Sequence, residues 1–343
     1  MKRILYTLAA LLGMAITSCE HKDLCYNHPE HSPKTQVNIV AQYEQEWQYT
    51  YEGATDWETQ WPAHFPMKYD NLRPGIPNGL RVMSYHKTDK EQIHNLPAHG
   101  GLLSLREGVH DLLFYNNDTE YIVFDEMASY ASARATTRSR SRNTYLGNSF
   151  YDSKATEENT VNAPDMLYGN YREGHYVERT TEAPTLEITM HPLVFTYVVR
   201  YEFSKGLQYV ALARGALAGM AESVYLNNGR TSPEAATILY DCTLEKFGAQ
   251  ALVNSFGVPN YPNENYSRVE GSYALNLEVM LKNGKMKTFE FDVTDQVKQQ
   301  PHGGVIVVKD LEVTDEEGMA GGSGFNVAVN GWGEYKDIEL PLL

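Results

Sequence analysis

Cysteine is scarce in this sequence of 343 residues. The three cysteines are Cys19, Cys25 and Cys242, too few for the dense disulfide framework of a small secreted fold. An exported location would permit one bond between Cys25 and Cys242, but the sequence does not show that these two thiols meet. The chain is long enough for two domains, each with its own hydrophobic core.

Positive charge is also in short supply. The chain has 29 Lys and Arg residues against 44 Asp and Glu residues, which gives a formal net charge of −15. Nucleic acids and anionic membrane surfaces bind clustered Lys and Arg side chains. We therefore expect no nucleic-acid partner.

Enzyme signature motifs are missing. The sequence contains no HExxH, GxSxG or CxxC pattern, no phosphate-binding GxxxxGK loop, and no GxGxxG between a strand and a helix. Asp, Glu and His residues are abundant, but no spacing brings them together into a catalytic set. We expect a protein that is not an enzyme and that holds no cofactor.

Long apolar runs are absent except for one at the start. Ile4 to Ile16 follows the positively charged Lys2 and Arg3, and its length suits the core of a signal peptide better than a membrane span. The run leads into Ile16-Thr17-Ser18-Cys19, which resembles the bacterial lipobox, whose cysteine is diacylated and becomes the mature N-terminus. We expect a lipoprotein signal peptide at 1–18 and a lipid on Cys19, with an ordinary cleaved signal as the alternative.

The segment at 19–36 is predicted to be a lipid-proximal tether. It holds four side chains of zinc-ligand type: His21, Cys25, His28 and His31. Such a set can bind zinc, and this remains the alternative. Pro29 and Pro33 favour an extended chain with no element to hold the ligands in a tetrahedron, so no metal is expected.

Beyond the tether, alternating apolar residues and β-rich runs predict strands almost throughout. They predict an all-β protein built from antiparallel sandwiches. The expected strands are 37–43, 80–85, 101–105, 109–115, 121–124, 185–190, 194–201, 207–217, 237–244, 251–258, 273–281, 287–292, 304–308, 325–329 and 336–340.

Three short stretches carry local turn or helix signals. Asn283-Gly284 is suited to a two-residue type I′ hairpin turn. Asn116 to Asp118 tolerates turn conformations and predicts a hairpin between the strands that flank it. Residues 292–297 predict a single helical turn.

Residues 128–180 lack the apolar periodicity of the rest, and we expect a flexible Arg/Ser/Thr-rich loop there. The boundary between the two domains is placed at its end, which gives an N-terminal domain at 37–182 and a C-terminal domain at 183–343. The loop contains a basic cluster with no acidic residue from Met127 to Tyr151: Arg134, Arg138, Arg140 and Arg142. Three interpretations stay open, namely a solvated loop, a protease-sensitive segment and a docking site for an acidic partner.

A second candidate site is the aromatic segment at 43–69. It contains Trp47, Trp57 and Trp61 among several tyrosines and phenylalanines. Such rings can form a platform for sugars or peptides, or they can be ordinary core packing.

Several motifs together resemble the fimbrillin-like lipoproteins of Bacteroidetes, in a subfamily of unassigned function. They are the lipobox, DLCYNH, LLFYNNDTEYIVF, the Arg/Ser/Thr run, GALAGMAESVYL, LEKFGA, FDVTDQV and GGSGFNVAVNGWGEYKDIELPLL. The resemblance implies two transthyretin-like β-sandwich domains in tandem and a stalk, tip or anchor position in surface fimbriae. In that group, subunits can polymerise by donor-strand exchange after an Arg-specific protease removes an N-terminal strand. Here the Arg cluster lies far inside the chain, which favours an accessory role.

We therefore expect a non-enzymatic exported lipoprotein that serves surface adhesion or fimbrial assembly. It would be lipid-anchored in the outer membrane, at the cell surface, with other fimbrial subunits or host and glycan ligands as partners. The alternative is a glycan- or peptide-binding surface lipoprotein that uses the aromatic segment at 43–69.

Overall fold

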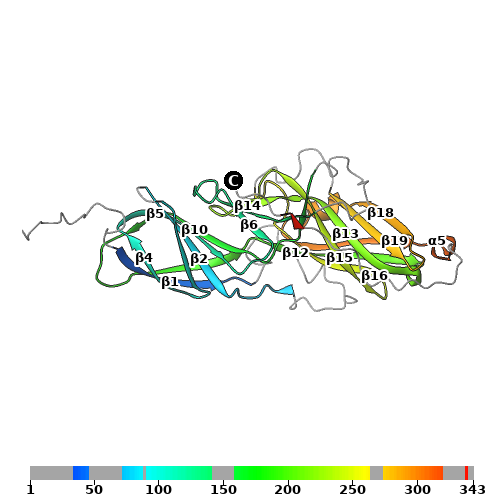
Figure 1. Cartoon of the computed structure of the whole chain (residues 1–343), viewed down its shortest axis with the longest axis horizontal. Coiled ribbons are helices and arrows are strands. Elements are labelled where there is room, and N and C mark those ends of the chain that lie inside the picture. The colour runs from blue at the N-terminus through cyan, green and yellow to red at the C-terminus, as the bar shows by residue number, and fades with distance from the viewer. Residues whose placement is uncertain are drawn as a thin grey trace, which may run out of the picture.

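The computed structural model describes residues 34–45, 72–87, 90–140, 158–262, 273–319 and 337–338. They form an elongated, nearly all-β molecule (Figure 1). Within these residues, no helix has the length and apolar character needed to cross a bilayer. The predicted all-β fold with sandwiches in tandem is confirmed, although some neighbouring strands pair in parallel, among them β1 (Lys34–Tyr43) with β11 (Thr185–Pro192).

The first sheet has seven strands in the order β3-β2-β5-β10-β11-β1-β4. Its alternating apolar side chains gather on one inner face, where Val37, Ile39 and Leu103 are almost fully buried, as expected of a sheet with one face turned to a core. The remaining strands are β2 (Gly79–His86), β3 (Gln92–Pro97), β4 (Gly100–Arg106), β5 (Gly108–Asn116) and β10 (Tyr168–Val177).

The second sheet contains ten strands, seven of them in the order β18-β17-β13-β15-β16-β12-β19. Its core joins apolar side chains of β12, β16 and β19 to those of β13, β15 and β17, so the sheet folds over on itself as a sandwich. The strands are β8 (Ser139–Arg140), β9 (Asn159–Asn162), β12 (Phe195–Lys205), β13 (Val210–Ala221), β15 (Ala235–Glu245), β16 (Gly248–Ser255), β17 (Ala274–Leu281), β18 (Met286–Asp292), β19 (Gly304–Glu312) and β20 (Asp337–Ile338). Three short helical elements accompany them: η5 (Leu207–Tyr209), α4 (Thr294–Lys298) and α5 (Asp315–Met319).

A three-stranded sheet joins the two halves. It has the order β14-β7-β6, from β6 (Ile122–Asp125), β7 (Arg134–Thr137) and β14 (Ser223–Tyr225). A buried cluster continues across the junction and packs Met83 and Leu113 from the first half with Val224 and Phe256 from the second. The halves are therefore joined by backbone pairing and by a shared apolar core.

The prediction of a flexible loop at 128–180 is wrong for much of its length. Arg134 to Thr137 pairs with strands on both sides, and β8, β9 and β10 also fall in this range. Ala135 and Thr137 are buried. These residues alternate as a strand requires, but they are too small for the large-apolar pattern by which strands are recognised.

The predicted domain boundary after residue 182 is also incorrect. Strand β11 belongs to the first sheet, beside β1, whereas β9, from before the boundary, pairs with β15 in the second sheet. The first sheet extends to Pro192. The chain therefore passes between the two sheets more than once.

The two hairpin predictions had different outcomes. Asn283-Gly284 does connect β17 and β18, but only Gly284 has a positive φ, of 82°. The Gly284 N–H donates to the Leu281 carbonyl, which corresponds to a three-residue loop and not to a type I′ turn. No hairpin forms around Asn117, since β5 pairs with β2 and β10 while β6 pairs with β7.

The loop before β6 is held by a carboxylate. Asp165 accepts the backbone N–H groups of Glu120 and Tyr121 at 2.7 and 2.5 Å. These bonds turn the chain towards the junction and away from β5. The expected helical turn at 292–297 is present as α4.

Candidate functional site

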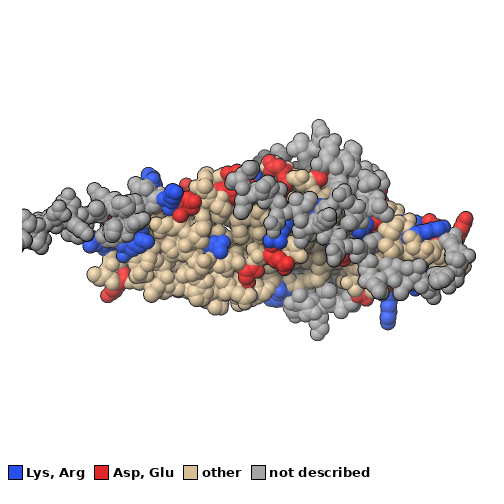
Figure 2. Space-filling model, viewed as in Figure 1, with Lys and Arg blue, Asp and Glu red and all other residues tan. Residues whose placement is uncertain are grey.

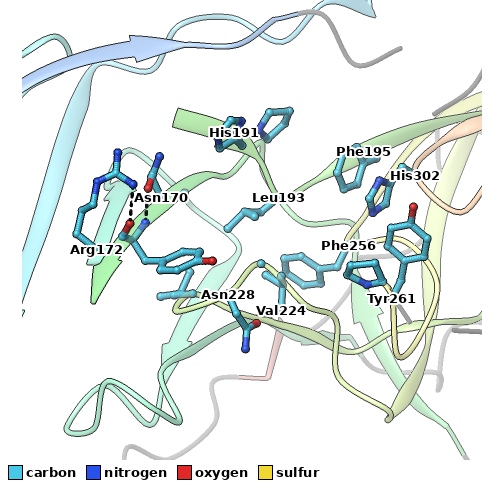
Figure 3. A pocket seen from close by; sticks show the side chains of 16 residues that line it. Asn170, Arg172, His191, Leu193, Phe195, Val224, Asn228, Phe256, Tyr261 and His302 are labelled. Atoms are coloured by element: carbon cyan, nitrogen blue, oxygen red, sulfur yellow. Dashed lines mark hydrogen bonds between the residues drawn. The ribbon is translucent and has the colours of Figure 1, made fainter. Parts of the chain in front are cut away.

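A cavity with a volume of about 510 Å³ lies at the junction of the two halves. We call it the junction pocket. Figure 3 shows its side chains, with Asn170 and Arg172 of β10 on one side and Phe195, Tyr261 and His302 on the other. Its apolar lining includes Leu193, Phe195, Val224, Leu226, Phe256 and Tyr261, and its polar lining includes Asn170, Arg172, His191, Asn228 and His302.

An aromatic stack forms one wall of the junction pocket. The His302 ring lies against Phe195 with ring centroids 4.2 Å apart and an interplanar angle of 11°, and Tyr261 meets it edge-on at 4.1 Å. Burial lowers the pKa of His302 to about 3, because a charged imidazole would lose its hydration there. The wall is therefore uncharged at neutral pH.

The rim of the pocket on β10 is polar. The Asn170 side-chain amide donates to the Thr189 carbonyl on β11, and its oxygen accepts the Tyr171 N–H at 2.6 Å. The Arg172 guanidinium is exposed and donates to the Tyr171 carbonyl at 3.3 Å. The Tyr171 side chain is 41% exposed. No carboxylate is among the described lining residues, so the rim favours a hydrogen-bond acceptor or an anionic group.

A second cavity, of about 410 Å³, lies between β10 and β11. We call it the edge slot. Gln42, Glu187, Ile188 and Thr189 line it, and it shares Asn170, Arg172 and His191 with the junction pocket. The two cavities are thus neighbours along one path over the surface.

This arrangement is suited to binding. Apolar walls with a few polar groups at the rim, placed between structural units, are typical of ligand sites. Among the described residues, no three His, Cys, Asp or Glu side chains converge as a metal site would require. The lining of both cavities is of a kind that binds ligands.

The described arginines of the basic cluster have different surroundings. Arg134 pairs with Asp125 at 2.7 Å, and this hydrogen bond raises the pKa of the Arg134 guanidinium. Arg140 donates to the Leu239 carbonyl at 3.1 Å and lies 3.9 Å from Asp241. Arg138 is half-buried, and Arg142 lies outside the described residues. Figure 2 shows blue and red side chains interspersed on the face in view, without a large area of one sign.

Several other predicted residues lie outside the described part of the chain. They are Cys19, His21, Cys25, His28, His31, Trp47, Trp57 and Trp61. The lipid site, the tether and the aromatic platform therefore stay predictions, as does a bond from Cys25 to Cys242. The predicted end of the tether at residue 36 is wrong, because β1 already begins at Lys34. Burial raises the pKa of the Cys242 thiol.

The pocket residues were not recognised from the sequence. They come from segments between residues 169 and 302, and no spacing relates them. The nearest signal is the aromatic and glycine-rich composition around 168–176, which was interpreted as loop.

Comparisons with known proteins identify a family and a relative. A family model described as a domain of unknown function, DUF5119, matches residues 68–241. A protein named "Putative fimbrium anchoring subunit Fim4B" from Bacteroides ovatus is 24% identical over 304 residues, which are 80% of this chain and 88% of that protein.

Solved structures bear on the fold. A crystal structure described as a putative adhesin from Bacteroides ovatus aligns with a TM-score of 0.57 at 20% identity, and covers 86% of this chain and 98% of its own. The fimbrial anchor protein Mfa2 from Porphyromonas gingivalis aligns at a TM-score of 0.42 and 10% identity, over 80% of this chain and 90% of its own. The first of these shows a shared fold across both halves.

Proposed function

This chain belongs to the DUF5119 family, and we propose that it is a non-enzymatic, lipid-anchored surface protein that holds a fimbrium at the outer membrane. The observation that carries the proposal is the relative named as a fimbrium anchoring subunit. The alignment with that relative spans 80% of this chain, so it includes parts of both halves. The proposal therefore concerns the whole molecule.

The shape of the molecule supports an anchoring role. The described chain begins with β1 at one end of the long axis, and α5 lies at the opposite end (Figure 1). Lys34 lies fifteen positions after Cys19, and an extended chain over that span reaches at most about 50 Å. A lipid on Cys19 would keep the β1 end near the membrane and leave the α5 end free.

The first strand is well placed to bear load. Strand β1 pairs with β11 on one side and with β4 on the other, and it buries Val37, Ile39 and Ala41 in the first core. Pulling on a lipid at the N-terminus would act along a strand that is bonded on both sides. A retained β1 suits an anchor, which must stay joined to its lipid.

An anchoring role also implies the partners of the protein. The protein would contact the membrane through the lipid alone, and its folded part would contact other fimbrial subunits. The cavities described above are suited to binding, which agrees with a role outside catalysis.

Deletion of the gene in the producing bacterium tests the proposal. We expect fimbriae to be shed into the medium, and complementation with the wild-type gene to restore them to the cells. Fimbriae that stay attached to cells of the deletion strain would contradict an anchoring role.

A further inference from the structure

The first sheet opens between two of its strands. Strands β10 and β11 pair only at Tyr168 with Pro192 and at Gly169 with His191. From there, β10 continues beside β5 as far as Val177, whereas β11 continues beside β1. Over residues 185–190, β11 therefore has a strand partner on one side only, within the part of the chain that the structure describes.

The backbone groups of β11 show which side is open. The Pro184 and Met190 carbonyls accept the N–H groups of Asn38 and Glu44, at 2.8 and 3.0 Å. Because backbone groups alternate in direction along a strand, the groups of Thr185, Glu187 and Thr189 point to the opposite side. Of these three residues, Glu187 and Thr189 line the edge slot.

One of these groups already has a substitute partner. The Thr189 carbonyl accepts the side-chain amide of Asn170 from across the slot. A side chain thus takes the place that a neighbouring strand would occupy. The Thr185 and Glu187 backbone groups remain as a template for an extended chain, as on any sheet edge.

The edge slot leads into the junction pocket, since Asn170, Arg172 and His191 line both cavities. Because β10 pairs with β11 at His191 and Pro192, a chain beside β11 must leave the strand before His191, and there it meets the shared rim of the junction pocket. A volume of about 510 Å³ is within the usual range for small-ligand sites, roughly 300–1,000 Å³. It has room for one large apolar side chain.

We propose that the edge slot and the junction pocket together bind an extended peptide segment of a second protein. The segment adds as a strand beside β11, and it places one large apolar side chain in the junction pocket. Backbone pairing supplies affinity and the pocket supplies selectivity, as in other cases of strand addition. Arg172, which lines the slot together with Glu187, offers a charged hydrogen-bond donor to an acidic residue next to the apolar one.

This inference rests on the proposed function, because it names the surface on which an anchored subunit would be held. It differs from exchange of an N-terminal strand, since β1 stays in place and β11 offers its other edge. No cleavage of this chain is needed.

Phage display tests the proposal. A library of random twelve-residue peptides is panned on the purified mature protein, which carries Cys19→Ala so that no lipid is attached. We expect selected peptides with alternating apolar residues and one aromatic anchor. Their binding should slow amide hydrogen exchange at Thr185 and Glu187. Proline in place of Glu187 removes an N–H that faces the slot, so Glu187→Pro should weaken binding at least about tenfold, whereas Glu187→Gln should not.

Two further variants keep the test valid if Glu187→Pro folds poorly. Asn228→Trp, at an exposed rim position, should block the pocket and weaken binding to a similar extent. Arg172→Glu should weaken the binding of acidic peptides, whereas Arg179→Glu, at an exposed position outside both cavities, should not.

Selected peptides that bind these variants as well as they bind the wild type would overturn the proposal, and so would a library that yields no enriched peptide. The result is independent of the anchoring test, which scores fimbriae on living cells. Shedding from the deletion strain combined with failed panning would refute only the docking surface.

Discussion

The His302 ring lies face to face with Phe195 at a centroid separation of 4.2 Å. This pair joins β12 to the segment before β19 and closes one wall of the junction pocket. Its burial makes His302 a base that stays neutral in the folded protein, since its pKa is lowered to about 3.

Acid should therefore weaken the fold through His302. In the unfolded chain the His302 imidazole is protonated below about pH 6.5, whereas in the folded chain it is protonated only near pH 3. The contribution of His302 to the unfolding free energy that is present above pH 6.5 is therefore lost as the pH falls. Between about pH 6.5 and pH 5, we expect the wild type to lose about 2 kcal/mol more of its unfolding free energy than His302→Phe loses. Urea unfolding of both proteins at the two pH values measures this. An equal loss in both would show that His302 is not the titrating group.

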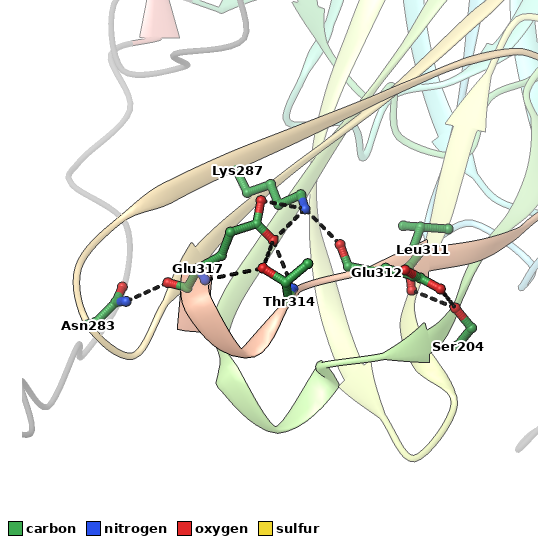
Figure 4. A network of polar contacts seen from close by, with 7 residues as sticks. All are labelled: Ser204, Asn283, Lys287, Leu311, Glu312, Thr314 and Glu317. Atoms are coloured by element: carbon green, nitrogen blue, oxygen red, sulfur yellow. Dashed lines mark hydrogen bonds and ion pairs between the residues drawn. The ribbon is translucent and has the colours of Figure 1, made fainter. Parts of the chain in front are cut away.

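The far end of the second sandwich is held by a small polar network (Figure 4). Thr314 and Glu317 bond to one another's backbone N–H groups at 2.8 and 3.2 Å, which is the arrangement of a capping box. Lys287 contacts both carboxylate oxygens of Glu317 at 2.8 Å, and this is the main reason that the pKa of Glu317 is lowered to about 2.

Removing this carboxylate should loosen α5. The stabilisation from Glu317 is present above about pH 4.5 and is lost as the pH falls towards 2, because the folded-state pKa is depressed. We expect Glu317→Gln to speed amide exchange over 314–319 at pH 7, whereas Glu316→Gln, at an exposed neighbour, should leave it unchanged. Equal exchange in the two variants would contradict the assigned role of Glu317.

The junction cluster should make the two halves unfold together. Phe256 is 2% exposed and packs with side chains of both halves, so Phe256→Ala should cost about 3–5 kcal/mol and separate thermal unfolding into two transitions. Leu252→Ala removes a side chain that is 45% exposed and should change stability by at most about 0.5 kcal/mol. Calorimetry distinguishes the two cases, and a single transition for Phe256→Ala would show that the halves are coupled elsewhere.

Strand β7 should resist proteolysis. It lies between β6 and β14, and a protease must first detach a strand that is paired on both sides. Limited trypsin digestion should therefore leave the bond after Arg134 intact while the rest of the fold persists. An early fragment that begins at Ala135, identified by mass spectrometry, would restore the interpretation of this segment as a loop.

The sequence predicted the fold class because large apolar residues alternate on long strands. Val37, Ile39 and Ala41 in β1 follow this rule, and all three are buried. Strand β7 was missed because its buried positions are Ala135 and Thr137, whose small side chains resemble those of a linker.

Strand β10 was missed for a different reason. Its register shifts between Arg172 and His175, so the period of two is broken at exposed polar residues. The candidate site depends on that strand. It also depends on the separation of β10 from β11 and on Phe256, Tyr261 and His302, which come from the other half. Only the tertiary fold brings these groups together, so local patterns could not predict the pocket.

The most direct test of anchoring is to express Cys19→Ala in a strain that lacks the native gene, with Cys25→Ala as the matched control. Fimbrial protein is then quantified on cells and in the medium. We predict that Cys19→Ala moves both this protein and the fimbriae from the membrane fraction into the medium, whereas Cys25→Ala keeps them on the cells. Fimbriae that remain on cells carrying Cys19→Ala would contradict the account.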